Sequence, residues 1–462
     1  MKTKLTQKFK KEINHVHFIG IGGISMSGLA EILHNKGLSI SGSDREDKDI
    51  TRHLSSLGID IKLGHDAKHI TDNIDLIVYT AAIKSDNPEF AAAKQKNIPM
   101  MDRAQLLGLI MADYENSIAV AGVHGKTTTT AILSEVLLAA KLDPTISVGG
   151  IVESIGSNLM IGNSAYFLAE ACEYADSFLQ FKPKVGIILN IDSDHMDYFG
   201  TFERLIDSFK QFAKNIPEDG TLIVHSSCAG QVIDGLKCNV IVYGKDGQFW
   251  AKDVQYNSDV QPSLTIMDKQ NALADVNLKL RGAHNVNNCL AVAAVASVLN
   301  IPIEATIKGL QKAVGAKRRF EHKGMYNGIT IVDDYSHHPT EVKAGLSSAS
   351  KNKRLICAFQ PHTYTRTQYY LDEFGKSFEA ADVILILPTF AAREEHIGPE
   401  VNYMSKKLCE EIAKNGKRSM FFDDFKSAAE WIKLNGNPGD LLITMGAGDI
   451  HLLGEGLISG EL

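Results

Sequence analysis

The chain has 462 residues, enough for two to four domains of ordinary size. A hydrophobic content of 44% and a charged content of 22% are typical of a globular protein. The formal net charge of −7 argues against a nucleic acid partner, because binding a phosphate backbone needs a basic face. No apolar run approaches the ~20 residues of a membrane span, so no membrane partner is expected either.

The six cysteines are scattered and form no Cys-x-x-Cys pair, so the sequence indicates neither a zinc ribbon nor a disulfide framework. The lysine-rich N-terminus leads into no long apolar core and is not a signal peptide. We therefore expect a cytoplasmic protein.

Residues 1–112 are predicted to form a first α/β domain. A strand at 15–19 leads into a glycine-rich turn and a helix, and a second strand, predicted at 38–41, is followed by a segment that ends in Asp44. The turn contributes Gly20, Gly22, Gly23 and Ser25. This is the opening of a Rossmann-like unit, which binds a diphosphate and has an acid about 20 residues further on. Ser25 replaces the third glycine of the dinucleotide fingerprint, so NAD is only weakly indicated, and a turn without a ligand stays open. Two more β–α units follow, and the second leads into Ala81-Ala82-Ile83.

Residues 113–316 are predicted to form a central domain around a phosphate-binding loop. A short apolar strand precedes the loop and a helix follows it. The loop consists of Gly122, Val123, His124, Gly125, Lys126, Thr127 and Thr128. Glycines let backbone amides converge on a phosphate, the lysine adds a full charge, and the threonine hydroxyl suits Mg²⁺. The loop is a short variant, because Val120 stands where the common form has its first glycine. The alternative is a plain glycine turn with Lys126 in solvent.

Acidic residues follow two buried strands of this domain. One strand is predicted to end at Glu170, and another, at 185–190, is followed by Asp192, Asp194 and His195. In open α/β sheets, ligands bind beyond the carboxyl ends of the strands. Oxygen ligands suit Mg²⁺, and His195 on its own would more often be structural. With Glu170 and Thr127 expected nearby, a metal-ligand role for His195 is favoured.

A glycine turn at 282 precedes an asparagine-rich helix start and a helix predicted at 289–299. Asparagine is a common helix N-cap, so Asn285 or Asn287 could be caps rather than ligand contacts.

Residues 317–462 are predicted to form a third, Rossmann-like domain. Four buried strands each deliver polar residues at their carboxyl ends. These polar clusters lie at 333–341, 360–366, 389–395 and 445–450. Any one cluster could be a solvated surface group, but four at strand ends favour a site. The expected fold is therefore α/β in three domains: Rossmann-like, P-loop ATPase-like and Rossmann-like.

Four motifs of the central domain resemble the Mur ligase family, the ATP-dependent amide-forming enzymes of bacterial peptidoglycan assembly. They are Gly-x-His-Gly-Lys-Thr-Thr-Thr, Glu-Ala-Cys-Glu-Tyr, Asn-Ile-Asp-Ser-Asp-His and Gly-Ala-His-Asn-Val-x-Asn. Together with the opening Gly-Ile-Gly-Gly-Ile-Ser-Met-Ser, they most closely match the member that joins L-alanine to UDP-N-acetylmuramate. The implied reaction runs through an acyl phosphate made from ATP.

The resemblance also implies roles for individual residues. Those expected to hold Mg²⁺ are Thr127, Glu170 and His195. Those expected at ATP, besides the phosphate loop, are His284, Asn288, Arg319 and Asp334. Those expected at L-alanine are Tyr335, His362 and Arg366, with His337 assisting removal of the amine proton. The glycine loop and Asp44 would hold the UDP group. The family usually has glycine where this chain has Ser336, which leaves the path of that loop open.

Other functions remain possible from the sequence. The nearest is the recycling ligase that joins a whole tripeptide to UDP-muramate. More distant ones are a folylpolyglutamate synthetase, an NAD-dependent oxidoreductase with an added ATPase domain, and a non-enzymatic ATP switch. The expected oligomeric state is a monomer or a homodimer.

Overall fold

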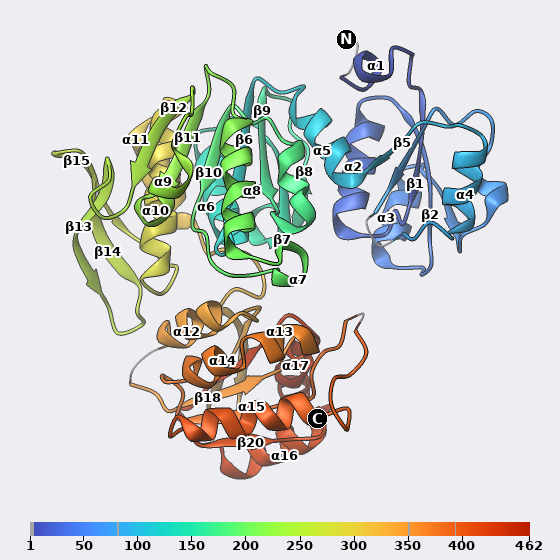
Figure 1. Ribbon diagram of the computed structural model, residues 1–462. Helices are drawn as coiled ribbons and strands as arrows, with labels where there is room; N and C mark the ends of the chain where they lie inside the picture. Colours follow the sequence, from blue (N-terminus) through green and yellow to red (C-terminus); the bar gives the residue numbers. More distant parts are fainter. Residues whose placement is uncertain (1–3, 81–82, 350–351, 393) are drawn as a thin grey trace. The chain divides into compact units, whose positions relative to one another are not determined.

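The structure is a computed structural model that describes residues 4–80, 83–349, 352–392 and 394–462. Ala81 and Ala82 of the second β–α unit, and Arg393 of the cluster at 389–395, lie outside the described residues. The chain divides into two compact units, described separately below; Figure 1 labels their helices and strands. Unit 1 comprises Met1–Phe249 and Ala291–Gly309, and unit 2 comprises Trp250–Leu290 and Leu310–Leu462. The domain boundaries at 112 and 316 stay predictions.

The first sheet of unit 1 has five parallel strands in the order β3-β2-β1-β4-β5. The strands are β1 (His15–Ile19), β2 (Ser39–Asp44), β3 (Asp60–Leu63), β4 (Leu76–Tyr79) and β5 (Met100–Asp102). The helices are α1 (Lys4–Phe9), α2 (Ile24–Asn35), α3 (Asp49–Ser56), η1 (Ala67–His69), α4 (Pro88–Gln95) and α5 (Arg103–Met111). The strand order reverses beside β1, so the glycine loop that follows β1 lies at a topological switch point, where such sheets bind ligands.

The strand predicted at 38–41 extends further than expected. It runs to Asp44, because Gly42, Ser43 and Asp44 pair with residues 61–63 of β3. Ser43 and Asp44 therefore belong to the sheet itself and not to a loop behind it.

The second sheet of unit 1 surrounds the phosphate loop. Its strands lie in the order β12-β11-β10-β6-β9-β7-β8, and all pair in parallel except β7 with β8. They are β6 (Asn116–Ala121), β7 (Thr145–Val152), β8 (Ser157–Met160), β9 (Tyr166–Ala171), β10 (Val185–Ile188), β11 (Thr221–His225) and β12 (Asn239–Tyr243). The helices are α6 (Lys126–Ala139), η2 (Glu153–Ile155), η3 (Tyr174–Gln180), α7 (Met196–Phe199), α8 (Phe202–Lys214) and α9 (Ser226–Val232). Strands β10, β6 and β9 are adjacent, so their carboxyl ends meet at one edge.

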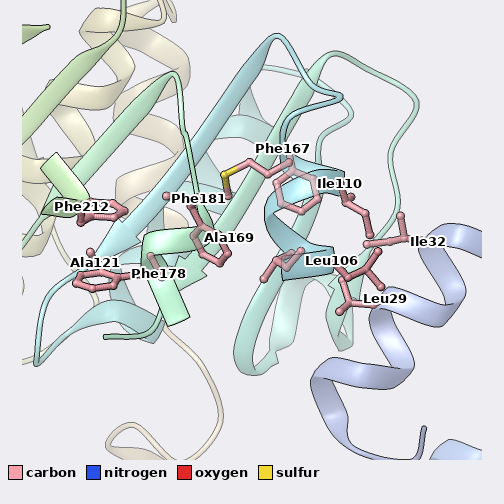
Figure 2. Close-up of a cluster of buried hydrophobic side chains, with 14 of the residues drawn as sticks. Leu29, Ile32, Leu106, Ile110, Ala121, Phe167, Ala169, Phe178, Phe181 and Phe212 are labelled. Atoms are coloured by element: carbon pink, nitrogen blue, oxygen red, sulfur yellow. The ribbon is translucent and has the colours of Figure 1, made fainter. Parts of the chain in front are cut away.

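One hydrophobic core joins the two sheets of unit 1. Figure 2 shows side chains of α2 and α5 packed together and followed by a row of phenylalanines. The labelled residues are Leu29, Ile32, Leu106, Ile110, Ala121, Phe167, Ala169, Phe178, Phe181 and Phe212. A Cβ added to Gly108 of α5 would lie 2.2 Å from the Gln180 carbonyl oxygen, so α5 packs directly on the backbone of η3.

Unit 2 contains a six-stranded sheet in the order β16-β17-β21-β18-β19-β20, parallel except for β16 with β17. Its strands are β16 (Glu321–Tyr326), β17 (Ile329–Asp334), β18 (Leu355–Phe359), β19 (Val383–Ile386), β20 (Ser419–Phe421) and β21 (Leu441–Met445). Its helices are α12 (Pro339–Ser347), α13 (Tyr364–Tyr369), α14 (Leu371–Ser377), α15 (Tyr403–Lys414), α16 (Phe425–Asn435) and α17 (His451–Ser459). One core packs α12, α14 and α15 on the sheet, and a second packs α16 and α17. The four strands predicted to carry polar clusters are neighbours in this sheet.

Unit 2 also holds the antiparallel pair β14 (Pro262–Asp268) and β15 (Asn271–Asn277). Strand β13 (Phe249–Tyr256) and helices α10 (His284–Val298) and α11 (Ile303–Lys312) cross the boundary between the units. The prediction of an α/β fold with parallel-rich sheets is confirmed. Among the described residues, no helix is long and apolar enough to span a membrane.

Candidate functional site

The phosphate loop joins the end of β6 to the start of α6. Gly122 and Gly125 have φ values of 138° and 81°, which only glycine adopts without strain. Gly125 is the N-cap of α6, and no side chain caps this helix. The first amides of a 14-residue helix are therefore left for an anion, and the helix dipole favours negative charge at this end.

Asn190, which follows β10, makes two side-chain hydrogen bonds to the backbone of the loop. Its Oδ1 accepts from the amide of His124 at 2.9 Å, and its Nδ2 donates to the carbonyl of the same residue at 2.9 Å. His124 also contacts Asp192, with 3.0 Å between Nε2 and Oδ2. The expected proximity of the Asp192 group and the loop is thus observed. Asn190 lies in a motif noted above, but nothing in its position or residue type predicted this role.

Lys126 is held by a partner that sequence reasoning missed. Its Nζ lies 2.8 and 3.1 Å from the two carboxylate oxygens of Glu173, and it donates to the carbonyls of Gly122 and Val123 at 2.6 and 2.9 Å. Burial lowers the pKa of Lys126, but the charge and hydrogen bond of Glu173, together with Cys172 and Glu170, outweigh that effect and the pKa is raised. Lys126 is therefore ionised at neutral pH. The only signal for Glu173 was its place in Glu-Ala-Cys-Glu-Tyr.

The residues expected to hold Mg²⁺ lie at one edge of the sheet. Thr127 follows Lys126 in the first turn of α6, and Glu170 on β9 pairs with Val120 of β6. Nε2 of His195 lies 3.7 Å from Oε1 of Glu173, which links it to Lys126.

The surroundings of these residues are acidic. Asp194 Oδ2 lies 3.9 Å from Nε2 of His195. The Glu170 carboxylate packs against Gly149, where an added Cβ would lie 2.6 Å from Oε2. Among the described side chains, this edge of the sheet offers several carboxylate and hydroxyl oxygens and a single lysine. Such a set of oxygen ligands fits a divalent cation.

The glycine loop of the first sheet is tied to the end of β2. Its amides at Gly20 and Ile21 donate to the Ser43 carbonyl at 2.8 and 2.9 Å, and the Gly22 amide donates to Asp44 Oδ2 at 2.8 Å. Asp44 thus anchors the loop, a role that its spacing did not reveal. Ser25, in the first turn of α2, accepts from Nη1 of Arg103 at 3.0 Å. Gly23 is the N-cap of α2 and no side chain caps this helix, so its first amides can face a diphosphate.

In unit 2, the asparagine-rich segment differs from expectation. Helix α10 begins at His284, five residues before the predicted 289, so Asn285 and Asn287 lie inside the helix and are not N-caps. The Asn285 side chain donates to the Arg281 carbonyl at 2.7 Å and accepts from Asn288 at 2.9 Å. The turn at Gly282, with a φ of 86°, starts the helix early. The His284 side chain is exposed, and its Nε2 lies 3.1 Å from Nδ2 of Asn285.

The residues expected at L-alanine are brought together in unit 2. The Tyr335 and His337 rings have centroids 5.3 Å apart, and those of His337 and His362 lie 5.5 Å apart. Arg366 Nη1 lies 3.1 Å from Nδ1 of His362. The four side chains therefore form one continuous group from the ends of β17 and β18.

Glu394 positions the helix that carries Arg366. Its carboxylate accepts from the amides of Tyr364 and Thr365 at 2.7 and 3.0 Å, in the first turn of α13. The third strand-end cluster, at 389–395, thus acts on the second, although no role was predicted for Glu394.

His337 is a neutral acceptor in this group. Burial lowers its pKa to about 4, against the raising effect of Glu341. Its Nδ1 lies 3.0 Å from the carbonyl oxygen of Tyr335, which can only accept, so Nδ1 carries the hydrogen and Nε2 carries the lone pair.

Asp334 and Arg319, expected at the nucleotide, both lie beside this group. Arg319 stacks on Tyr335 at 5.3 Å from the ring centroid. Asp334 accepts from the amides of Phe320 and Ser336 at 2.8 and 2.9 Å and from the Ser336 hydroxyl. The serine that replaces the usual glycine therefore adds a hydrogen bond that fixes this loop.

Comparison with known proteins identifies related chains over the whole length. Three family models match in succession: Mur ligase family, catalytic domain, over residues 15–115; Mur ligase middle domain, over 120–296; and Mur ligase, glutamate ligase domain, over 318–448. The UDP-N-acetylmuramate–L-alanine ligase of Agathobacter rectalis is 47% identical, covering 97% of this chain and 98% of that protein. The enzyme of the same name from Acetivibrio thermocellus is 46% identical, covering 97% and 95%.

Solved structures agree with these matches. The UDP-N-acetylmuramate–alanine ligase of Thermotoga maritima superposes with a TM-score of 0.79 at 26% identity, covering 97% of this chain and 99% of that chain. A murein peptide ligase of Psychrobacter arcticus shares the fold, with a TM-score of 0.70 at 23% identity over 96% and 98% of the two chains.

Proposed function

This chain belongs to the Mur ligase family, and we propose that it joins L-alanine to the carboxylate of UDP-N-acetylmuramate in an ATP-dependent reaction. The observation that carries the proposal is 45–47% identity, over 95–97% of the chain, to relatives named for this ligation. The products are UDP-N-acetylmuramoyl-L-alanine, ADP and phosphate. The reaction contributes to peptidoglycan synthesis.

The phosphate loop supports the activation step. Phosphoryl transfer from ATP converts the muramate carboxylate into an acyl phosphate, and this chemistry depends on positioning and charge neutralisation. The loop amides bind the phosphate oxygens. Lys126 exchanges its Glu173 partner for the transferring phosphoryl group. Glu173 keeps the lysine ionised and close to the loop until then.

Mg²⁺ at Thr127, Glu170 and His195 would neutralise phosphate charge in the same step. The acidic edge described above supports this assignment, because its described side chains offer too few cations to balance a polyphosphate. His284, Asn288, Arg319 and Asp334 are assigned to the nucleotide on the family pattern.

The second step needs a neutral amine held against the acyl phosphate. Arg366 suits the alanine carboxylate, because a guanidinium binds a carboxylate with two parallel hydrogen bonds. Nε2 of His337 has the lone pair that can accept a hydrogen from the amine. With a pKa of about 4, His337 orients the amine but is too weak a base to keep its proton, so the proton lost as the C–N bond forms leaves with the phosphate that the attack displaces.

The alternatives from sequence are not favoured. The relatives carry the alanine ligase name and not that of a tripeptide ligase, and all three family models describe ligase domains and not an oxidoreductase. A cytoplasmic location and a monomeric or homodimeric state stay predictions.

The test is phosphate release from ATP in the presence of UDP-N-acetylmuramate. One reaction receives L-alanine, and a second receives the tripeptide L-Ala-γ-D-Glu-meso-diaminopimelate. Release with alanine alone is expected. Release with the tripeptide alone would assign the chain to recycling and would leave the ATP-site assignments standing.

A further inference from the structure

A buried polar cluster lies beneath the glycine loop of the first sheet, in unit 1. We call it the Glu89 cluster, and its members are His17, Ser43, His65, His69 and Glu89. Glu89 and Ser43 are 0% exposed and His17 is 1% exposed. Neither the phosphate loop nor the amino acid group uses these side chains, and nothing in the sequence pattern pointed to them.

The Glu89 carboxylate is the centre of this cluster. Ser43 Oγ donates to Oε2 at 2.5 Å, and Nδ1 of His65 lies 2.9 Å from the same oxygen. Nδ1 of His69 lies 2.7 Å from Oε1, and Nε2 of His17 lies 3.8 Å from it. Both oxygens of one carboxylate are therefore surrounded by donors.

Glu89 is an anion at neutral pH. Burial raises the pKa of this carboxyl, but the contacts with His17, Ser43, His69 and His65 outweigh burial and lower it to about 2. An ionised carboxylate only accepts hydrogen bonds, so the facing nitrogens of His65 and His69 both carry hydrogens.

Ser43 connects the cluster to the substrate loop. Its side chain donates to Glu89, while its backbone carbonyl accepts from the amides of Gly20 and Ile21. The next residue, Asp44, accepts from the amide of Gly22. The end of β2 thus holds three consecutive amides of the loop, and the loop in turn sets where α2 begins.

We propose that Glu89 is a positioning residue for UDP-N-acetylmuramate, acting through Ser43 on the glycine loop and the N-terminus of α2. This inference rests on the proposed function, which assigns the diphosphate to that loop. The free amides at the start of α2 bind an anion well only if their direction is fixed before it arrives. A buried, charge-assisted hydrogen bond to Ser43 supplies that rigidity without touching the substrate.

The variant Glu89→Gln tests the charge with little change of shape. An amide offers one acceptor oxygen and one donor nitrogen, so the substituted side chain would place a donor either against Ser43 and His65 or against His69. We expect the dissociation constant for UDP-N-acetylmuramate, measured by calorimetry without ATP, to rise about tenfold or more. The dissociation constant for ATP should be unchanged, because the phosphate loop belongs to another sheet.

A double-mutant cycle distinguishes positioning from general damage. If Glu89 acts through Ser43, then Ser43→Ala also weakens UDP-N-acetylmuramate binding, and the double variant binds no worse than Glu89→Gln. The matched control is Asp75→Asn. Asp75 accepts from the amides of Asn14 and His15 at 2.9 and 3.1 Å, at the opposite end of β1 from the glycine loop. The Asp75→Asn variant should have a lower free energy of unfolding and an unchanged dissociation constant for UDP-N-acetylmuramate.

The outcomes are separable. Wild-type affinity in Glu89→Gln, additive effects in the cycle, or equal weakening by Asp75→Asn would overturn the positioning role. If Glu89→Gln does not fold, Ser43→Ala decides, and unchanged affinity in that variant rejects the inference. If the wild-type chain itself fails to bind UDP-N-acetylmuramate, the proposed function fails and not this step alone.

Discussion

Breaking the ion pair between Lys126 and Glu173 should destabilise unit 1 more than removing both charges. Glu173 is 1% exposed, and the nearest carboxylate oxygen lies 2.8 Å from Nζ. At an effective dielectric constant near 20, this separation corresponds to a gross attraction of about 6 kcal/mol, much of which offsets desolvation. Lys126→Met leaves Glu173 as a buried anion without its lysine, and the imidazole of His195, at 3.7 Å, is too distant to replace it. We expect a loss of about 3 kcal/mol in the free energy of unfolding.

The double variant Lys126→Met/Glu173→Gln should recover most of that loss, because it buries no charge. Urea unfolding of the four proteins of the cycle at pH 7.5 measures the coupling. The folded pKa of Lys126 is raised, so its contribution is complete below the unfolded value near 10.4 and disappears only as pH rises through the folded pKa. A cost below about 1 kcal/mol for Lys126→Met, or additive effects, would refute the reasoning.

The same variant tests the division of labour between the two sheets of unit 1. Lys126→Met should abolish turnover and leave UDP-N-acetylmuramate binding largely intact, because the glycine loop and the Glu89 cluster belong to the first sheet. Loss of that binding in a folded variant would show that the UDP group is assigned to the wrong loop.

Further predictions concern packing, pH and substrate binding. Gly108→Ala should lower the unfolding temperature by several degrees, since its Cβ would lie 2.2 Å from the Gln180 carbonyl. Gly230→Ala, in helix α9, meets nothing within 4 Å and should raise the unfolding temperature slightly in the same thermal scan, because alanine favours a helix more than glycine does. The half-buried His337, with a folded pKa of about 4, makes unfolding easier as pH falls from 6.5 towards 4; replacing it with glutamine should remove roughly 3 kcal/mol of that loss in urea titrations at the two pH values. Asp44→Ala removes the acceptor of a loop amide and should weaken UDP-N-acetylmuramate binding several-fold in calorimetry, with ATP affinity unchanged.

Local rules were enough to predict the fold class and the presence of the strands, although β2 runs to Asp44 and not to 41 as predicted. The phosphate loop follows from glycine spacing and a helix start, and the polar clusters of unit 2 follow from buried strands with polar ends. The predicted start of α10 was wrong. Asparagine is a common N-cap, but its residue type alone does not say whether it caps the helix or lies inside the first turn. The side-chain bond from Asn285 to the Arg281 carbonyl, which stabilises the earlier start, is a contact that residue type alone does not specify.

The partners of the charged side chains could not be predicted in the same way, because they depend on the path of the backbone between elements. Glu170 and Glu173 are three residues apart, and the sequence does not say which one faces Lys126. After β9 the chain turns through Ala175 and Asp176, whose φ values of 54° and 55° are unfavourable for residues with a side chain. In that turn the Asp176 amide donates to the Glu173 carbonyl at 3.0 Å, so the turn includes the backbone of Glu173. A motif can therefore identify a lysine for phosphate, whereas the carboxylate that holds this lysine belongs to a turn of two strained residues with no signature of their own.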